Sequence, residues 1–333
     1  MGKKEEYRTE MDSLGEREVP AEVYYGIQTL RATENFQVSH LPNHPYLIDA
    51  YVSIKRSAAL ANMEVGWMDP DKGAAIIKAA DEILSGEMRD QFVVDRFQAG
   101  AGTSTNMNVN EVIANRALEI MGHPLGSYNI ISPNDDVNMA QSTNDTFPTA
   151  MHISVYRMTM DLVDVISELA RGFEEKGREF KDFMKTGRTH LQDAVPVTLG
   201  GELKAYASAL SRVNDEMRRR ASQLLELPLG GTATGTGINA HKEYRERAIG
   251  HLTDLTGYDL RPNPSAHEAM QSTTRIVAVS SSYKELAIEL GRMANDLRLL
   301  SSGPTSGFSE ITLPAVQPGS SIMPGKVNPV LPE

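Results

Sequence analysis

The segment from Ile276 to Leu300 carries the feature that most limits how this chain can fold. Its apolar side chains recur three and four residues apart without a break, the spacing of a seam between near-parallel packed helices. Segments near residues 145–173 and 203–225 carry similar stripes. Three long helices with such stripes predict a bundle. The stripes are Ile276, Val279, Tyr283, Leu286, Leu290, Met293, Leu297 and Leu300; Leu203, Tyr206, Leu210, Val213, Met217 and Leu224; and Val155, Met158, Leu162, Val165, Leu169 and Phe173.

The sequence before this bundle has a different character. Residues 1–141 mix short polar and apolar stretches with helical patches, for example at residues 51–63 and 73–83. We therefore expect a mainly α chain with two domains. The first is a mixed, mostly helical N-terminal domain at residues 1–141, and the second is a helical-bundle domain at residues 142–333.

The composition argues against several classes of function. The net charge of -11, from 33 basic and 44 acidic residues, argues against nucleic acid or an anionic membrane as a partner. No apolar run approaches the ~20 residues of a membrane span, and the first six residues lack the apolar core of a secretion signal. The chain has no cysteine, and its histidines show no metal-ligand spacing. These features favour a cytoplasmic protein that uses neither a metal nor another cofactor.

A loop rich in polar groups follows the last bundle helix. Residues 317–329 contain three prolines and two glycines, a density that neither a helix nor a central strand tolerates. The same loop carries Ser320, Ser321, Lys326 and Asn328. A kinked loop with anion-binding groups is a candidate active-site lid. By composition alone, a surface turn is the commoner interpretation.

Three other polar clusters lie far apart in the sequence. Gly100–Asn108 combines glycines with hydroxyls and amides that can bind a carboxylate, although such clusters are often only caps or turns. Gln141–Pro148 lies where the first long helix should begin, and free N–H groups and the helix dipole favour an anion there. Simple N-capping is the alternative. Gly187–Ala194 contains His190, which we expect just before a helix and held in one tautomer by its polar neighbours.

The four clusters, taken in the order in which they occur along the sequence, resemble those of the aspartase/fumarase superfamily. Residues 317–329 fit its signature loop GSSxMPxKxN, and the similarity runs from Val23 to Glu333. The resemblance implies a homotetramer whose active sites collect residues from three subunits. It also implies elimination of an amine or water across a C–C bond with release of fumarate. Members of the superfamily continue beyond this loop with two bundle helices and a small domain, so we expect the sequence to be truncated.

Different positions favour the two main branches of the superfamily. Tyr24–Gly26, Gly102–Thr105 and Gln141–Asn144 are similar to the aspartase branch, which eliminates ammonia from L-aspartate. Val109 and Thr146 are among the positions similar to the fumarase branch, which forms fumarate from L-malate. The balance favours the aspartase branch, and both branches bind a four-carbon dicarboxylate. A non-catalytic structural member and an inactive fragment remain alternatives, although the intact polar clusters argue against the first.

The resemblance also implies roles for single residues. Ser320 is the expected base that takes the Cβ proton, and His190 is the second expected catalytic residue. Proton removal gives a dianionic aci-carboxylate, and stabilising its charge is the main catalytic task. A serine is a poor base unless backbone N–H groups stabilise its alkoxide, which the turn at residues 319–322 could supply. The expected substrate-binding residues are Thr103, Ser142, Thr143, Asn144, Thr189, Ser321, Lys326 and Asn328.

Overall fold

Two apolar cores organise the chain, one in each of two structural units. The computed structural model describes residues 6–333, so most of the segment inspected for a secretion signal lies outside the described residues. Unit 1 extends to residue 158 and includes residues 221–276, and unit 2 comprises residues 159–220 and 277–333. This partition differs from the expected boundary at residue 141, because the chain returns to unit 1 after its first excursion. The domain boundary itself stays a prediction.

Unit 1 is a cluster of helices around one core. Helix α2 packs against α3 and α7, and α3 packs against α4. The helical patches predicted at residues 51–63 and 73–83 are confirmed as parts of α2 and α3. The helices are α1 (Ile27–Asn35), α2 (Pro45–Glu64), α3 (Pro70–Leu84), α4 (Thr103–Ile120), the first part of α5 (Thr143–Glu179), α7 (Tyr244–Thr256) and α8 (Ala266–Gln271). The largest buried side chains of this core are Tyr51, Ile54, Ile76, Ile83, Ile113, Leu118, Ile131 and Tyr244.

Local sequence explains where these helices begin. Helix α3, for example, follows Asp69, whose carboxylate accepts hydrogen bonds from the backbone N–H groups of Asp71 at 2.9 Å and Lys72 at 3.2 Å. Pro70 occupies the first helical position, where its missing N–H costs nothing. Short elements complete unit 1. They are the hairpin β1 (Tyr7–Asp12) and β2 (Gly15–Pro20), the parallel pair β5 (Glu226–Leu227) and β6 (Arg261–Pro262), and a π-helical turn at Pro133–Val137.

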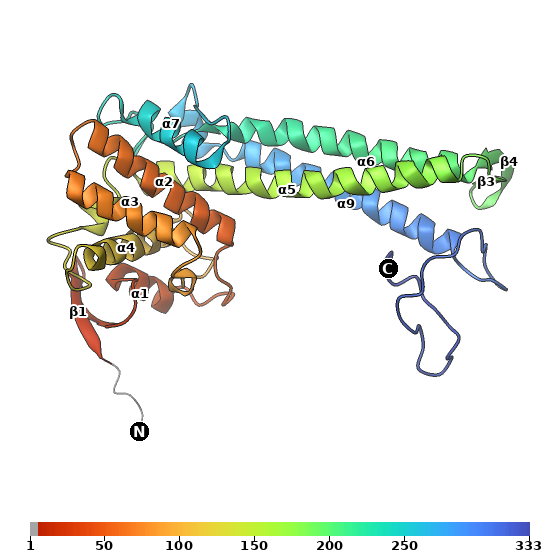
Figure 1. Cartoon of the computed structure of the whole chain (residues 1–333), viewed down its shortest axis with the longest axis horizontal. Helices are drawn as coiled ribbons and strands as arrows, with labels where there is room; N and C mark the ends of the chain where they lie inside the picture. Colours follow the sequence, from red (N-terminus) through yellow and green to blue (C-terminus); the bar gives the residue numbers. More distant parts are fainter. Residues whose placement is uncertain (1–5) are drawn as a thin grey trace. The chain divides into compact units, whose positions relative to one another are not determined.

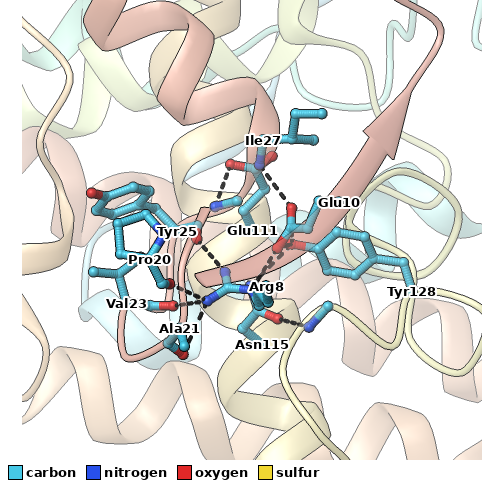
Figure 2. Close-up of polar contacts among 12 residues, drawn as sticks. Arg8, Glu10, Pro20, Ala21, Val23, Tyr25, Ile27, Glu111, Asn115 and Tyr128 are labelled. Atoms are coloured by element: carbon cyan, nitrogen blue, oxygen red, sulfur yellow. Dashed lines mark hydrogen bonds and ion pairs between the residues drawn. The ribbon is translucent and has the colours of Figure 1, made fainter. Parts of the chain in front are cut away.

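Two buried carboxylates hold the start of α1 (Figure 2). Glu111 of α4 accepts hydrogen bonds from three backbone N–H groups at 2.8–3.0 Å, and Glu10 of β1 accepts one from Ile27 at 2.8 Å. Arg8 forms an ion pair with Glu10 at 2.8 Å and donates to the backbone carbonyls of residues 20, 21, 23 and 25. The first N–H groups of a helix have no partner within it, and an anion there is favourable. These contacts therefore join β1, α1 and α4.

Unit 2 contains three long helices that run side by side (Figure 1). They are residues 159–179 of α5, α6 (Leu199–Ala221) and α9 (Thr274–Leu300), of which α9 enters the unit at residue 277. The hairpin β3 (Met184–Thr189) and β4 (Gln192–Thr198) connects α5 to α6. Residues 301–333 form turns and extended chain without a helix or a strand, so the loop predicted at residues 317–329 is confirmed. The core is formed by Val163, Ile166, Ala170, Leu199, Leu203, Tyr206, Leu210, Met217, Leu286 and Met293.

The mainly α fold and two of the three apolar stripes are confirmed. Every predicted stripe residue of α6 and α9 is buried or half-buried, including Leu224, which lies in the 3-10 turn after α6. The stripe predicted for α5 is wrong in part, because Val165 is 60% exposed and Leu169 is also exposed. Val163 and Ile166 face the core instead, since α5 carries apolar side chains on adjacent faces and α6 and α9 cover only one of them. No helix within residues 6–333 is long and apolar enough to cross a membrane.

Candidate active site

Two of the predicted polar clusters meet in unit 1, where α4 and α5 begin. Helix α4 starts at Thr103 and α5 starts at Thr143, so each cluster lies at a helix N-terminus. Gly102 has a φ of +77° and lies against the ring of Phe147, where an added Cβ would come within 2.5 Å of the ring. The Thr146 hydroxyl of α5 donates to the amide oxygen of Asn106 of α4 at 3.3 Å. The positive ends of both helices are therefore close together, which favours an anion beside them.

The predicted substrate ligands in unit 1 differ in their present partners. Ser142 and Thr143 are half-buried, while Thr103 and Asn144 are exposed. The Ser142 hydroxyl accepts a hydrogen bond from the Asn144 backbone N–H at 3.1 Å, so the capping interpretation holds for this residue. A hydroxyl that accepts through a lone pair can still donate its hydrogen to a carboxylate. The Asn144 side chain donates to the carbonyl of Ala233 at 2.9 Å, which fixes the orientation of its amide.

Asp145 is a buried anion that sequence reasoning did not single out. Its carboxylate accepts hydrogen bonds from the backbone N–H groups of Ser142 at 2.9 Å, Thr232 at 2.9 Å and Gly230 at 3.1 Å. Burial raises the pKa of Asp145 to about 6, although these three N–H groups act in the opposite direction. The carboxylate thus holds the glycine-rich turn at residues 230–232 against the start of α5.

Lys55 is a buried cation that sequence reasoning also missed. It lies within α2 and its ammonium group donates to the amide oxygens of Asn106 at 2.7 Å, Asn138 at 2.8 Å and Gln141 at 3.0 Å. Burial lowers the pKa of Lys55 to about 7, and the field of Asp145 partly opposes this effect. A lysine within a helical patch is usually interpreted as a surface residue. The sequence around Lys55 therefore gives no local indication that its ammonium group is buried among three amides.

His190 lies in the turn of a β-hairpin, so the prediction that it precedes a helix is wrong. His190 and Leu191 both have a positive φ, of 52° and 61°, between the paired residues Thr189 and Gln192. A two-residue turn with this geometry matches the twist of antiparallel strands, which explains why the chain reverses here. Thr189 and His190 are exposed. Within residues 6–333, no hydrogen bond to the His190 ring fixes its tautomer.

The chain after α9 is held to strand β3 of this hairpin. Glu310 forms ion pairs with Lys185 at 2.6 Å and with Arg188 of β3. The guanidinium group of Arg188 also lies over the ring of Phe308, 4.1 Å from the ring centroid. These contacts place residues 308–310 beside β3, about ten residues before the expected base Ser320. They limit how far the signature loop can move from the hairpin.

The signature loop closes on itself around Ser320. The Ser320 hydroxyl oxygen accepts hydrogen bonds from the backbone N–H groups of Met323 at 3.2 Å and Ile322 at 3.3 Å. The Gly319 N–H donates to the carbonyl of Lys326 at 2.8 Å, and the Asn328 side chain donates to the carbonyl of Gly319 at 3.3 Å. The turn therefore supplies the N–H groups that a serine alkoxide needs. The side chains of Ser321 and Lys326 are exposed, and Asn328 is half-buried.

Comparison with known proteins decides the family. A family model described as "Lyase" matches residues 15–333. The aspartate ammonia-lyase of a Bacillus species is 52% identical over 326 residues, which are 98% of this chain and 70% of that relative. The chain belongs to the aspartase/fumarase lyase superfamily. The resemblance carried by the signature loop and the three other clusters is thereby confirmed.

Solved structures of other lyases share the fold. A fumarate lyase:delta crystallin from Brucella melitensis, bound to cobalt, superposes with a TM-score of 0.95 at 51% identity, covering 98% of this chain and 72% of that one. A class II fumarase from Schistosoma mansoni superposes with a TM-score of 0.94 at 38% identity and the same coverage. The lyase fold therefore extends across relatives named for different reactions, so the fold alone does not select the substrate.

Proposed function

We propose that this lyase eliminates ammonia from L-aspartate and releases fumarate. One observation carries the proposal. Over 98% of this chain, the identity to the Bacillus aspartate ammonia-lyase is 52%, whereas the identity to the Schistosoma fumarase is 38%. The segments Tyr24–Gly26, Gly102–Thr105 and Gln141–Asn144, which are similar to the aspartase branch, support the same choice.

Ser320 takes the Cβ proton of L-aspartate in the proposed mechanism. The N–H groups that now bond to its hydroxyl oxygen, from Ile322 and Met323, stabilise the alkoxide. The electron pair of the broken C–H bond moves onto the neighbouring carboxylate and gives the aci-carboxylate. This intermediate then expels the protonated amine as ammonia, because the electrons of the C–N bond leave with the nitrogen. A C=C bond forms, and the product is fumarate.

The remaining predicted residues bind the two carboxylates and the amine. Ser321, Thr103, Ser142 and Thr143 bind the carboxylate on which charge accumulates, and the N-termini of α4 and α5 support three of them. Lys326 and Asn328 bind the α-carboxylate through charge-assisted hydrogen bonds, with Thr189 and His190 nearby. Asn144, Thr103 and His190 surround the leaving amine.

We also propose the assembly and location that the superfamily resemblance implies. The active protein is a homotetramer in the cytoplasm, and each active site takes residues from three subunits. The clusters of unit 1 and those of unit 2 then meet at the subunit interfaces. Sedimentation or size-exclusion analysis of the active form tests this part separately from the chemistry.

The decisive experiment follows fumarate by its ultraviolet absorbance, with purified protein and either L-aspartate or L-malate. We expect fumarate from L-aspartate and little from L-malate. Ready formation from L-malate but not from L-aspartate would establish the fumarase alternative. No fumarate from either substrate would support a non-catalytic member or an incomplete enzyme. A Ser320→Ala variant purified in parallel shows whether any activity belongs to this chain rather than to a contaminant.

A further inference from the structure

Lys55 combines complete burial with a set of uncharged partners. Its side chain has no exposed surface, and its three N–H donors meet three amide oxygens at 2.7–3.0 Å. An ammonium group has three donors and no acceptor, so its hydrogen-bonding capacity is filled. Within residues 6–333, no carboxylate lies at ion-pair distance from Lys55, and Asp145 acts on it only through its field.

The burial of this ammonium group is not explained by a gain in the stability of the fold. Burial of an ammonium group is costly, and replacement of buried charges by apolar side chains of similar volume is often neutral or stabilising. A methionine in the middle of α2 would fill similar space without the cost of desolvating a charge, but it would leave three amide oxygens without this donor. The contribution of Lys55 must therefore be sought in the arrangement of its three partners.

The three amide partners of Lys55 are themselves oriented by further hydrogen bonds. The amide nitrogens of Asn106 and Asn110 donate to the oxygen of Asn138 at 3.2 and 3.3 Å. The Asn138 nitrogen donates to the backbone carbonyl of Gln141 at 3.2 Å, and the Gln141 nitrogen donates to two backbone carbonyls. Because each amide nitrogen already has an acceptor, the oxygen side of each amide points to Lys55. This arrangement satisfies the amides of Asn106, Asn138 and Gln141 together, whereas the buried amide oxygen of Asn110 has no partner within the described residues.

The same three partners belong to the segments that carry the proposed substrate ligands. Asn106 lies one turn after Thr103 on α4, and its oxygen also accepts the Thr146 hydroxyl of α5. Gln141 directly precedes Ser142–Asn144. Asn138 ends the π-helical turn that leads into this segment. The partners of Lys55 thus include Gln141, one residue before Ser142, and Asn106, one helical turn after Thr103.

We propose that Lys55 is a positioning residue for the substrate site, whose ammonium group holds the starts of α4 and α5 in the register that binds the dicarboxylate. The inference rests on the proposed function, because it assigns Lys55 a role in that same site. Lys55 does not touch the substrate. It acts through Asn106, Asn138 and Gln141 on Thr103 and on Ser142–Asn144.

The test compares Lys55→Met, which removes all three donors, with the wild-type protein. We expect kcat/KM for L-aspartate to fall by roughly tenfold or more, as misplaced binding groups typically cause. Part of the loss should appear in KM, which a smaller folded fraction does not change. Hydrogen exchange should become faster at the backbone amides of residues 103–108 and 139–147, and should stay unchanged in α6 of unit 2.

Two further variants distinguish a positioning role of Lys55 from an unspecific effect of removing a positive charge. Lys78→Met changes the same charge on the exposed face of α3 and should leave both kinetics and exchange unchanged. Lys55→Gln keeps an amide donor with two hydrogens and should recover part of the kcat/KM lost in Lys55→Met. A folded Lys55→Met protein with kcat/KM within twofold of the wild type would overturn the proposal, as would a Lys55→Gln protein no better than Lys55→Met.

A variant outside α2 covers the case in which Lys55→Met does not fold. Gln141→Met removes one of the three acceptors at a half-buried position, and we expect the same direction of change with a smaller loss. Unchanged kinetics in Gln141→Met would contradict the role of the network. If the wild-type protein forms no fumarate from L-aspartate, the proposed function fails. The exchange rates at residues 103–108 and 139–147 then decide separately whether Lys55 holds the two helix starts.

Discussion

Replacement of Glu111 by glutamine tests which of two opposing effects controls a buried carboxylate of unit 1. Glu111 is 1% exposed and accepts hydrogen bonds from three backbone N–H groups at the start of α1. Burial disfavours the ionised form, whereas the N–H groups favour it. Burial is the stronger effect, and it raises the pKa of Glu111 from 4.5 to about 7.

This pKa change fixes the sign of the pH dependence. Between pH 4.5 and 7, the unfolded chain loses the Glu111 proton while the folded protein keeps it, so the free energy of unfolding falls as pH rises. The full difference amounts to about 3 kcal/mol. Glutamine cannot ionise, but its NH₂ group faces backbone donors, which costs ~1–3 kcal/mol at every pH. We therefore expect the free-energy difference between the two proteins to shift by about 2.5 kcal/mol toward Glu111→Gln between pH 5 and pH 8.

Urea unfolding followed by circular dichroism at several pH values measures this difference. Glu87→Gln, which removes an exposed carboxylate after α3, controls for the general effect of the charge change. A difference between wild type and Glu111→Gln that stays constant with pH would refute the reasoning. If the difference in the free energy of unfolding shifted toward the wild type as pH rises, the three N–H groups would outweigh burial in their effect on the pKa of Glu111.

Three other substitutions probe the proposed site and its support. Ser320→Ala should lower kcat for L-aspartate by roughly 10²–10⁴-fold with little change in KM, because a general base acts in the transition state; steady-state kinetics would contradict the assignment if most of the rate remained. Lys326→Ala should raise KM by roughly 10–100-fold through loss of a charge-assisted bond, so an unchanged KM would argue against its contact with the α-carboxylate. Gly102→Ala should destabilise the fold by roughly 2–4 kcal/mol, because the residue has a positive φ and its Cβ would meet Phe147. A melting temperature equal to the wild type would show that Phe147 moves aside freely.

Helical periodicity explains how much of the fold could be predicted. The seam of α9 is a local pattern, and each of its eight predicted residues is buried or half-buried. The stripe predicted for α5 is wrong in part because that helix carries apolar side chains on adjacent faces, and the sequence does not indicate which face α6 and α9 cover. Val165 and Ile166 are neighbours in sequence, yet only Ile166 enters the core.

The hairpin that carries His190 could not be predicted because its turn lacks the usual residues. Tight hairpin turns with two positive φ angles favour Asn and Gly. Here His190 and Leu191 adopt those angles, although neither residue type prefers them. The expectation that His190 lies just before a helix therefore missed strand β4, which separates the turn from α6. The proposed roles of Thr189 and His190 rest on the resemblance to the superfamily and not on a correct prediction of the element that carries them.

There is a physical reason why the residues that support the candidate site, such as Lys55, are harder to predict from sequence than its proposed ligands. Hydroxyls and amides at helix starts are recognisable because capping and anion binding are local properties of a helix N-terminus. Lys55 reaches partners 51, 83 and 86 residues away, and each of these amides would read as a surface residue by itself. A buried polar network can be identified only when the fold has brought all its members together, since an unsatisfied member is costly. Substitutions at Lys55 should therefore affect Thr103 and Ser142–Asn144 together, whereas a change at one ligand should leave the other helix start in place.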